Sequence, residues 1–108
     1  MKNQTVEKGK IIAIISYLPF VGFIIALLMN ISSKNSFASF HIRQALGLGI
    51  FAFLNKYVIG KILGENLGMG ILIFLAILWI IGLIGAIKGE EKSTPLLGGL
   101  FQEWFKGI

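Results

Sequence analysis

The sequence has no cysteine and no aspartate, and it contains a single histidine, a single arginine and two prolines. Without cysteine, disulfides, thiolate metal sites and thiol nucleophiles are excluded. One histidine, His41, and five glutamates offer neither a catalytic triad nor an evident metal-ligand set, and the glycines match no phosphate-binding motif. We therefore expect no catalytic residue, no metal site and no cofactor, and a protein that is not an enzyme.

Charged residues are also scarce, at 14% of 108 residues, whereas 56% are hydrophobic and the mean hydropathy is +0.84. Soluble domains carry about 25% charged residues, so this composition predicts a lipid environment. Ten basic residues oppose five acidic ones. The basic residues flank apolar runs instead of forming one face, which favours anionic lipid headgroups as partners and argues against nucleic acid.

Two apolar runs are long enough to cross a bilayer. Residues 11–31 and 67–87 each hold 21 residues without a charged side chain. As helices they would extend roughly 31 Å, against a hydrocarbon core of about 30 Å. A signal peptide is the alternative for the first run, but the run exceeds a usual hydrophobic region and no small-x-small cleavage site follows. Both runs are predicted to be membrane spans.

The middle of the chain is apolar but interrupted. Residues 42–63 could form another span, although that span would contain Asn55 and Lys56. A lysine at mid-helix costs roughly 2.5–3.5 kcal/mol, which several Leu, Ile and Phe residues can offset. We expect a third span with Asn55 and Lys56 as candidate intramembrane polar residues. The alternatives are a re-entrant or interfacial helix, and lysines that merely mark the exit of the span.

The end of the chain predicts a short amphipathic helix over residues 95–106. Thr94 and Pro95 form a helix-start signal, and apolar residues then recur at helical spacing. Phe101, Trp104 and Phe105 are candidate residues of a membrane-interface tail, and docking of this tail on the protein itself is the alternative. The expected fold is a single all-α domain over residues 1–108, an integral membrane bundle with three transmembrane helices and this tail helix.

Further candidates are His41, Arg43 and Gln44, a polar cluster at the entrance of the second predicted span. On a helix His41 and Gln44 share a face, and Arg43 points roughly opposite. The cluster could bind a phosphate, a substrate or a carboxylate, or its charged member could simply reach water along an apolar stem. Pro19, near the centre of the first predicted span, is expected to kink that helix, either to shape a cavity or to fit packing.

The chain resembles a family of small three-span bacterial and archaeal membrane proteins related to a multispanning component of the chloroplast inner-envelope protein translocon. The resemblance rests on Tyr17-Leu18-Pro19, on the run Phe40-His41-x-Arg43-Gln44-Ala45 and on the glycine-rich exit of the last predicted span. It implies a three-span protein of a bacterial or archaeal plasma membrane. It also adds weight to His41, Arg43 and Gln44 without giving them a role.

Three functions remain open at this point. The first is a non-enzymatic subunit or scaffold of a membrane assembly, with a connection to translocation suggested by the resemblance. The second is a homo-oligomeric pore, an ion channel or a holin-like protein, with Asn55 and Lys56 lining its lumen. The third is a soluble helical lipid carrier or binding module. Small residues on the predicted spans would allow helices to pack closely, within one chain or between chains.

Overall fold

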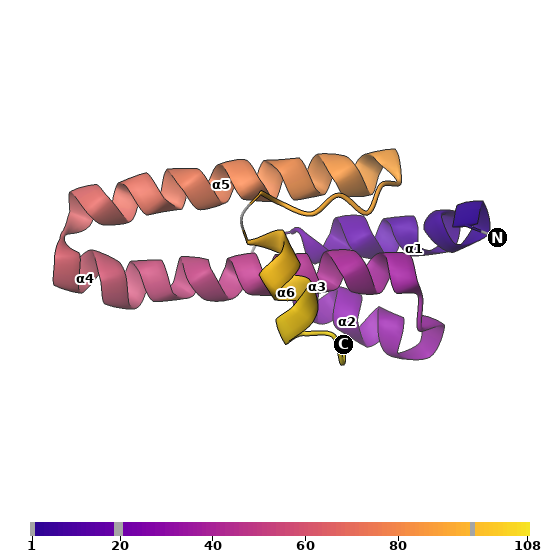
Figure 1. Cartoon of the computed structure of the whole chain (residues 1–108). Helices are drawn as coiled ribbons and strands as arrows, with labels where there is room; N and C mark the ends of the chain where they lie inside the picture. Colours follow the sequence, from indigo (N-terminus) through magenta and orange to yellow (C-terminus); the bar gives the residue numbers. More distant parts are fainter. Residues whose placement is uncertain (1, 19–20, 96) are drawn as a thin grey trace.

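The computed structural model describes residues 2–18, 21–95 and 97–108, and every regular element among them is helical (Figure 1). The elongated molecule measures 48 × 22 × 22 Å. In chain order the helices are α1 (Lys2–Ser16), α2 (Gly22–Ser33), α3 (Ser36–Leu54), the π-helix η1 (Asn55–Ile59), α4 (Gly60–Leu63), α5 (Glu65–Lys88) and α6 (Gly98–Trp104).

The first predicted span, residues 11–31, is wrong as a single helix. α1 ends at Ser16 and α2 begins at Gly22, and the two helices pack against each other side by side. A tight last turn closes α1, in which the amide of Leu18 donates to the carbonyl of Ile15 at 3.0 Å. At Gly22 an added Cβ would lie 2.3 Å from that same carbonyl, so only glycine allows α2 to start this close. The predicted kink at Pro19 lies outside the described residues.

The middle segment does form one long helical rod, but it starts earlier than predicted. Asn35 caps α3, because its side-chain oxygen accepts a hydrogen bond from the amide of Ala38 at 3.0 Å. α3, η1 and α4 then follow each other without a break, so that helix extends over Ser36–Leu63. Its 28 residues are apolar enough and long enough to cross a membrane.

α5 confirms the predicted helix over residues 67–87 with bounds one or two residues wider. Gly64, with a φ of 107°, makes the turn between α4 and α5, and this backbone conformation favours glycine. α5 therefore folds back along α3 as the second helix of a long helical hairpin (Figure 1). α5 is the second helix that is long and apolar enough to span a membrane, so the structure offers two such helices among the described residues where the sequence predicted three.

The predicted tail helix over residues 95–106 is shorter than expected. α6 begins at Gly98 and ends at Trp104, and it crosses α3 near the middle of the molecule (Figure 1). Thr94 does not cap it, because the residue at the N-cap position is Leu97. The amide of Thr94 instead donates to the side chain of Gln44 at 2.9 Å, which fastens the segment before α6 to α3.

The packed core occupies one end of the molecule. α1, α2 and α6 all gather around the part of the hairpin that contains the first half of α3 and the second half of α5 (Figure 1). The other half of the hairpin, around η1, α4 and the start of α5, stands alone. The fold therefore consists of a five-helix packed end and a bare two-helix arm.

Candidate functional site

A buried polar network lies at the centre of the packed end, between α1 and α3. The hydroxyl oxygen of Tyr17 lies 2.6 Å from Nδ1 of His41, and Nε2 of Gln44 donates to that hydroxyl oxygen at 2.8 Å. All three side chains are at most 1% exposed. His41 Nε2 lies 2.8 Å from the carbonyl of Glu90, and a carbonyl can only accept, so this nitrogen carries a proton. In a neutral imidazole Nδ1 has no proton, so it accepts a hydrogen bond from the Tyr17 hydroxyl.

The same network attaches the loop that follows α5 to α3. Gln44 Nε2 also donates to the carbonyl of Lys92 at 3.2 Å, and Gln44 Oε1 accepts from the amide of Thr94. Together with the bond from His41 to the carbonyl of Glu90, three backbone groups of the loop are tied to α3. His41 and Gln44 therefore connect α1, α3 and the loop that leads to α6.

Small residues on α5 make room for this network. An added Cβ at Gly82 would lie 2.7 Å from the hydroxyl oxygen of Tyr17 and 2.9 Å from Nε2 of Gln44. One turn earlier on α5, the indole nitrogen of Trp79 donates to the carbonyl of Tyr17 at 2.7 Å. Because Tyr17 follows directly after α1, this bond closes the end of that helix against α5.

Arg43 points to the opposite face of α3 and holds the end of the chain. Its guanidinium donates from Nη1 to Oε1 of Gln102 at 3.3 Å and from Nη2 to the carbonyl of Lys106 at 3.0 Å. In turn, Gln102 Nε2 donates to the carbonyl of Phe40 at 2.8 Å. The cluster predicted from the sequence is thus divided, since His41 and Gln44 bind the loop whereas Arg43 binds the C-terminal helix.

Asn55 and Lys56 do not share a face. Asn55 is 4% exposed and donates from Nδ2 to the carbonyl of Gly68 on α5 at 2.8 Å, while its Oδ1 has no partner. Lys56 is exposed on the outside of the arm, 5.3 Å from the centre of the Tyr57 ring. The structure therefore separates the two candidate intramembrane residues, one inside the hairpin and one outside it.

The three aromatic residues of the tail also differ in environment. Phe101 is fully buried, and an added Cβ on Gly47 of α3 would lie 2.2 Å from its ring. Phe105 is half-buried, and Trp104 is 56% exposed. The ring of Phe51 lies 5.4 Å from that of Phe101 and 6.3 Å from that of Trp104. α6 therefore docks on the protein itself through Phe101, which was the alternative to a tail in contact with lipid only.

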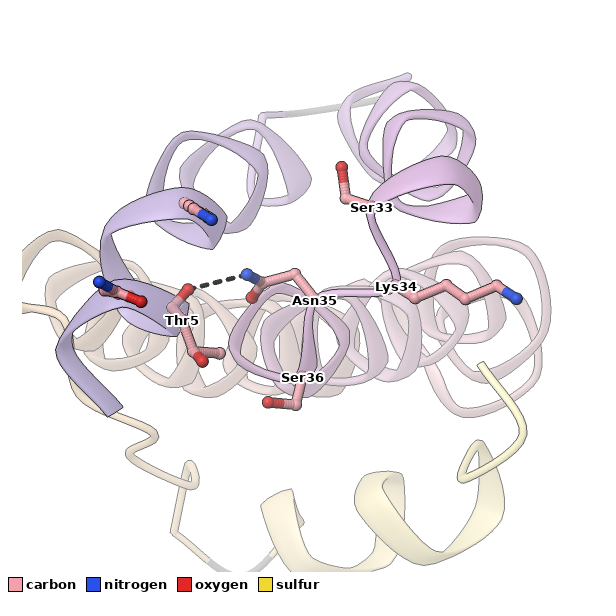
Figure 2. A pocket seen from close by; sticks show the side chains of 7 residues that line it. Thr5, Ser33, Lys34, Asn35 and Ser36 are labelled. Carbon is pink, nitrogen blue, oxygen red and sulfur yellow. Dashed lines mark hydrogen bonds between the residues drawn. The ribbon is translucent and has the colours of Figure 1, made fainter. Parts of the chain in front are cut away.

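A polar pocket lies at the outer end of the packed core, beside the turn between α2 and α3 (Figure 2). Its wall includes a hydrogen bond from Nδ2 of Asn35 to the carbonyl of Thr5 at 2.8 Å. Figure 2 shows that Lys34 points away from Thr5 and that Ser36 points away from Ser33, so these side chains do not converge on one ligand. Across the described residues, no group of three or more histidines, cysteines or acidic residues could hold a metal ion.

Several residues of the network were not identified as candidates from the sequence. Tyr17 and Thr94 contact His41 and Gln44, and Trp79 contacts Tyr17, only because α1, α5 and the loop pack around α3. These contacts join residues 24 to 62 positions apart. One signal was available for Tyr17, because a polar aromatic residue buried in an apolar helix needs a hydrogen-bond partner.

Comparison with known proteins gives a different family from the one that the resemblance in the sequence suggested. Residues 8–101 match the model of the MamF/MmsF family, described as the magnetosome magnetite crystal formation protein family. No curated protein and no solved structure matches the chain. The resemblance to a translocon-related family is therefore wrong. Its most specific part, the run with His41, Arg43 and Gln44, consists of residues whose contacts hold the loop and tail in place. The match covers most of the sequence, and the chain belongs to the MamF/MmsF family.

Proposed function

We propose that this chain is an integral membrane protein whose α3–α5 hairpin crosses a bilayer, and that it acts as a non-enzymatic subunit or scaffold in a membrane assembly for magnetite crystal formation. The family supplies the link to magnetosomes. The observation that carries the membrane part of the proposal is the bare apolar arm of the hairpin.

Exposed apolar side chains cover most of the arm. In the most apolar stretch of the helix Ser36–Leu63 only 17% of the residues are buried, and in that of Glu65–Lys88 only 28% are. In water, helices of this kind would be covered by other elements, since a soluble monomer rarely exposes a large contiguous apolar patch. The exposed large apolar residues of the arm are Ile50, Phe53, Leu54, Tyr57, Val58, Ile62, Leu63, Leu67, Met69, Leu72, Ile73, Phe74 and Ile77.

The length of the hairpin fits a bilayer. α5 has 24 residues, which at about 1.5 Å per residue gives roughly 36 Å, enough for a hydrocarbon core of about 30 Å with some tilt. Glu65 begins this helix and Lys88 ends it. Charged side chains therefore stand at its two ends, where they would meet the two membrane surfaces.

The α1–α2 pair fits a hairpin that enters the membrane only partway. At the open end of the pair, the side chain of Asn35 donates to the carbonyl of Thr5. At its closed end, Tyr17 contacts Gln44 of α3 and lies beside Gly82 of α5, so the pair covers only part of the length of the hairpin. The exposed apolar residues of the pair include Ile11, Leu18, Val21, Ile25 and Leu28. In a partial hairpin residues 10 and 33 lie on the same side of the membrane, whereas a full span over residues 11–31 would put them on opposite sides.

Single-cysteine labelling tests this arrangement, because the natural chain has no cysteine and each introduced thiol is unique. We expect Lys8→Cys, Ser33→Cys and Lys88→Cys to react with a membrane-impermeant maleimide from one side of sealed vesicles, and Asn66→Cys from the other. The decisive position is Ser33. Labelling of Ser33→Cys from the same side as Asn66→Cys would overturn the partial hairpin, and labelling of all four positions from one side would overturn the membrane crossing.

The role in crystal formation has a separate test. We place the protein in the magnetosome membrane or in the bacterial plasma membrane. Deletion of its gene in a magnetite-forming host is expected to change the size or shape of the crystals, and the full chain is expected to restore them. Phe101→Ala, which is expected to release α6, serves as the comparison variant for the assembly role. Crystals that are unchanged by the deletion would contradict the proposal.

A further inference from the structure

The bare arm carries a basic-aromatic cluster that the proposed function leaves unexplained. It consists of Lys56 and Tyr57 in η1 and Lys61 in α4, and we call it the tip cluster. The Nζ atom of Lys56 lies 5.3 Å from the centre of the Tyr57 ring, and the Nζ atom of Lys61 lies 5.9 Å from it. Two ammonium groups within about 6 Å of one ring are both in cation–π range.

The π-helix is what brings these residues together. Lys56 and Lys61 are five positions apart, and at about 100° per residue in a regular α-helix they would project in directions roughly 140° apart. In a π-helix the hydrogen bond joins residues five apart, so such residues lie closer to the same side of the rod than they do in an α-helix. η1 covers Asn55–Ile59 and thereby turns both lysines toward the same side of the rod.

A buried polar contact accompanies this π-helix. Nδ2 of Asn55 donates to the carbonyl of Gly68 on the facing helix at 2.8 Å. Gly68 also allows a close approach, because its Cβ would lie 3.1 Å from the Cα of Gly60. The contact fixes the first residue of η1 against α5, so the direction of the tip cluster is set by the packing of the hairpin.

No ion pair among the described residues neutralises the charge of the tip cluster. Among the described residues the ion pair joins Lys106 and Glu103, and neither Lys56 nor Lys61 pairs with a carboxylate. All three side chains of the tip cluster are exposed. Two neighbouring positive charges repel each other, and an anion between or beside them relieves the repulsion. Lysine is a common phosphate-binding residue because it acts as a compact point charge.

The position of the tip cluster selects the kind of phosphate. Lys61 lies in the last helical turn before Gly64, and Lys56 lies about 7.5 Å further from that turn at about 1.5 Å per residue. Near the end of a membrane helix, the long side chain of a lysine extends along the helix to the lipid headgroups, and tyrosine is enriched at the same level. From these observations we propose that Lys56, Tyr57 and Lys61 form a binding site for the phosphate group of an anionic phospholipid, in the leaflet reached by the hairpin turn.

This inference rests on the proposed membrane crossing, and the test separates the two. The full chain is reconstituted in phosphatidylcholine vesicles that contain spin-labelled phosphatidylglycerol or spin-labelled phosphatidylcholine. Electron paramagnetic resonance then gives the share of each labelled lipid that the protein immobilises. Flotation of the vesicles is measured first. A chain that does not float with them overturns both proposals, whereas a chain that floats but shows no lipid preference overturns only the site.

We expect the natural chain to prefer phosphatidylglycerol and Lys56→Gln/Lys61→Gln to lose most of that preference, by about fivefold for each lysine removed. The matched control, Lys88→Gln/Lys92→Gln, removes the same charge at the other end of the molecule and is expected to lose less. Lys56→Arg/Lys61→Arg keeps the charge and is expected to keep the preference. Equal loss in the tip and control variants would show a general charge effect and would overturn the site.

A soluble ligand is distinguished by competition. Inorganic phosphate is added to the natural chain, with sodium chloride at the same ionic strength as the reference. A phospholipid held at the membrane surface is expected to stay immobilised equally in both solutions. Displacement by inorganic phosphate beyond that by chloride would assign the tip cluster to free phosphate and overturn the lipid site.

Discussion

Gln44 is a buried side chain that uses both ends of its amide to join three parts of the molecule. We expect Gln44→Leu to leave the amide of Thr94 without an acceptor, which costs about 1–3 kcal/mol for a buried group. The loop after α5 should then loosen, and trypsin should cut after Lys92 faster than in the natural chain. The control is Gln4→Leu, the same change at an exposed position of α1. Unchanged cleavage in Gln44→Leu would contradict a fastening role for this residue.

Gly82 and Gly70 offer a matched pair of glycines in α5. An added Cβ at Gly82 would collide with Tyr17 and Gln44, whereas nothing lies within 4 Å of one at Gly70. Gly82→Ala is therefore expected to destabilise the protein by about 1–3 kcal/mol through overpacking. Gly70→Ala should stabilise it by about 0.5–1 kcal/mol through helix propensity. Circular dichroism during thermal unfolding in detergent measures both. Equal unfolding temperatures for the two variants would show that the Gly82 contact is not tight.

The prediction of individual residues succeeded in selecting polar side chains and failed in assigning their partners. His41, Arg43 and Gln44 stand out in the sequence because polar groups are few, and helical spacing gives their directions. Their partners cannot be read from spacing, since the carbonyl of Glu90 and the amide of Thr94 are 49 and 50 positions away. Those backbone groups are identified only once α5 has folded back along α3.

At the scale of elements, α6 depends on one buried ring. Phe101 is fully buried and lies on the glycine surface of α3 at Gly47. Phe101→Ala is expected to release α6, since truncation of a buried phenylalanine costs about 3–5 kcal/mol. Hydrogen exchange of the α6 amides should then lose its protection. Trp104→Ala removes a larger side chain that is 56% exposed and should change the exchange far less. Similar exchange in both variants would place the docking contact elsewhere.

Element bounds follow from the sequence where a single physical cause sets them. α5 is an uninterrupted apolar run between charged residues, so its bounds were predicted within two residues. The run over residues 11–31 satisfies the same length criterion, yet α1 and α2 fold it into a hairpin. Length and hydropathy alone do not tell a continuous helix from two short ones. The tight approach at Gly22, which allows the reversal, is a tertiary contact that the sequence does not reveal.

At the scale of the whole molecule, exposure in the structure has a meaning that depends on the solvent. Ile77 lies near the middle of α5 and is 52% exposed. If water surrounded the arm, Ile77→Lys would be nearly neutral, as surface substitutions usually are within about 0.5 kcal/mol. If lipid surrounds it, the same change costs roughly 2.5–3.5 kcal/mol, because a charge then lies at the centre of the bilayer.

We therefore expect Ile77→Lys to reduce the fraction of the chain that stays in membranes after alkaline carbonate extraction. Glu91→Lys places a lysine in the exposed loop after α5 and should extract like the natural chain. A third variant, Ile77→Phe, keeps the position apolar and controls for the loss of isoleucine. Full retention of Ile77→Lys would mean that the arm lies in water or against a polar partner, and the bilayer would then no longer account for the bare hairpin.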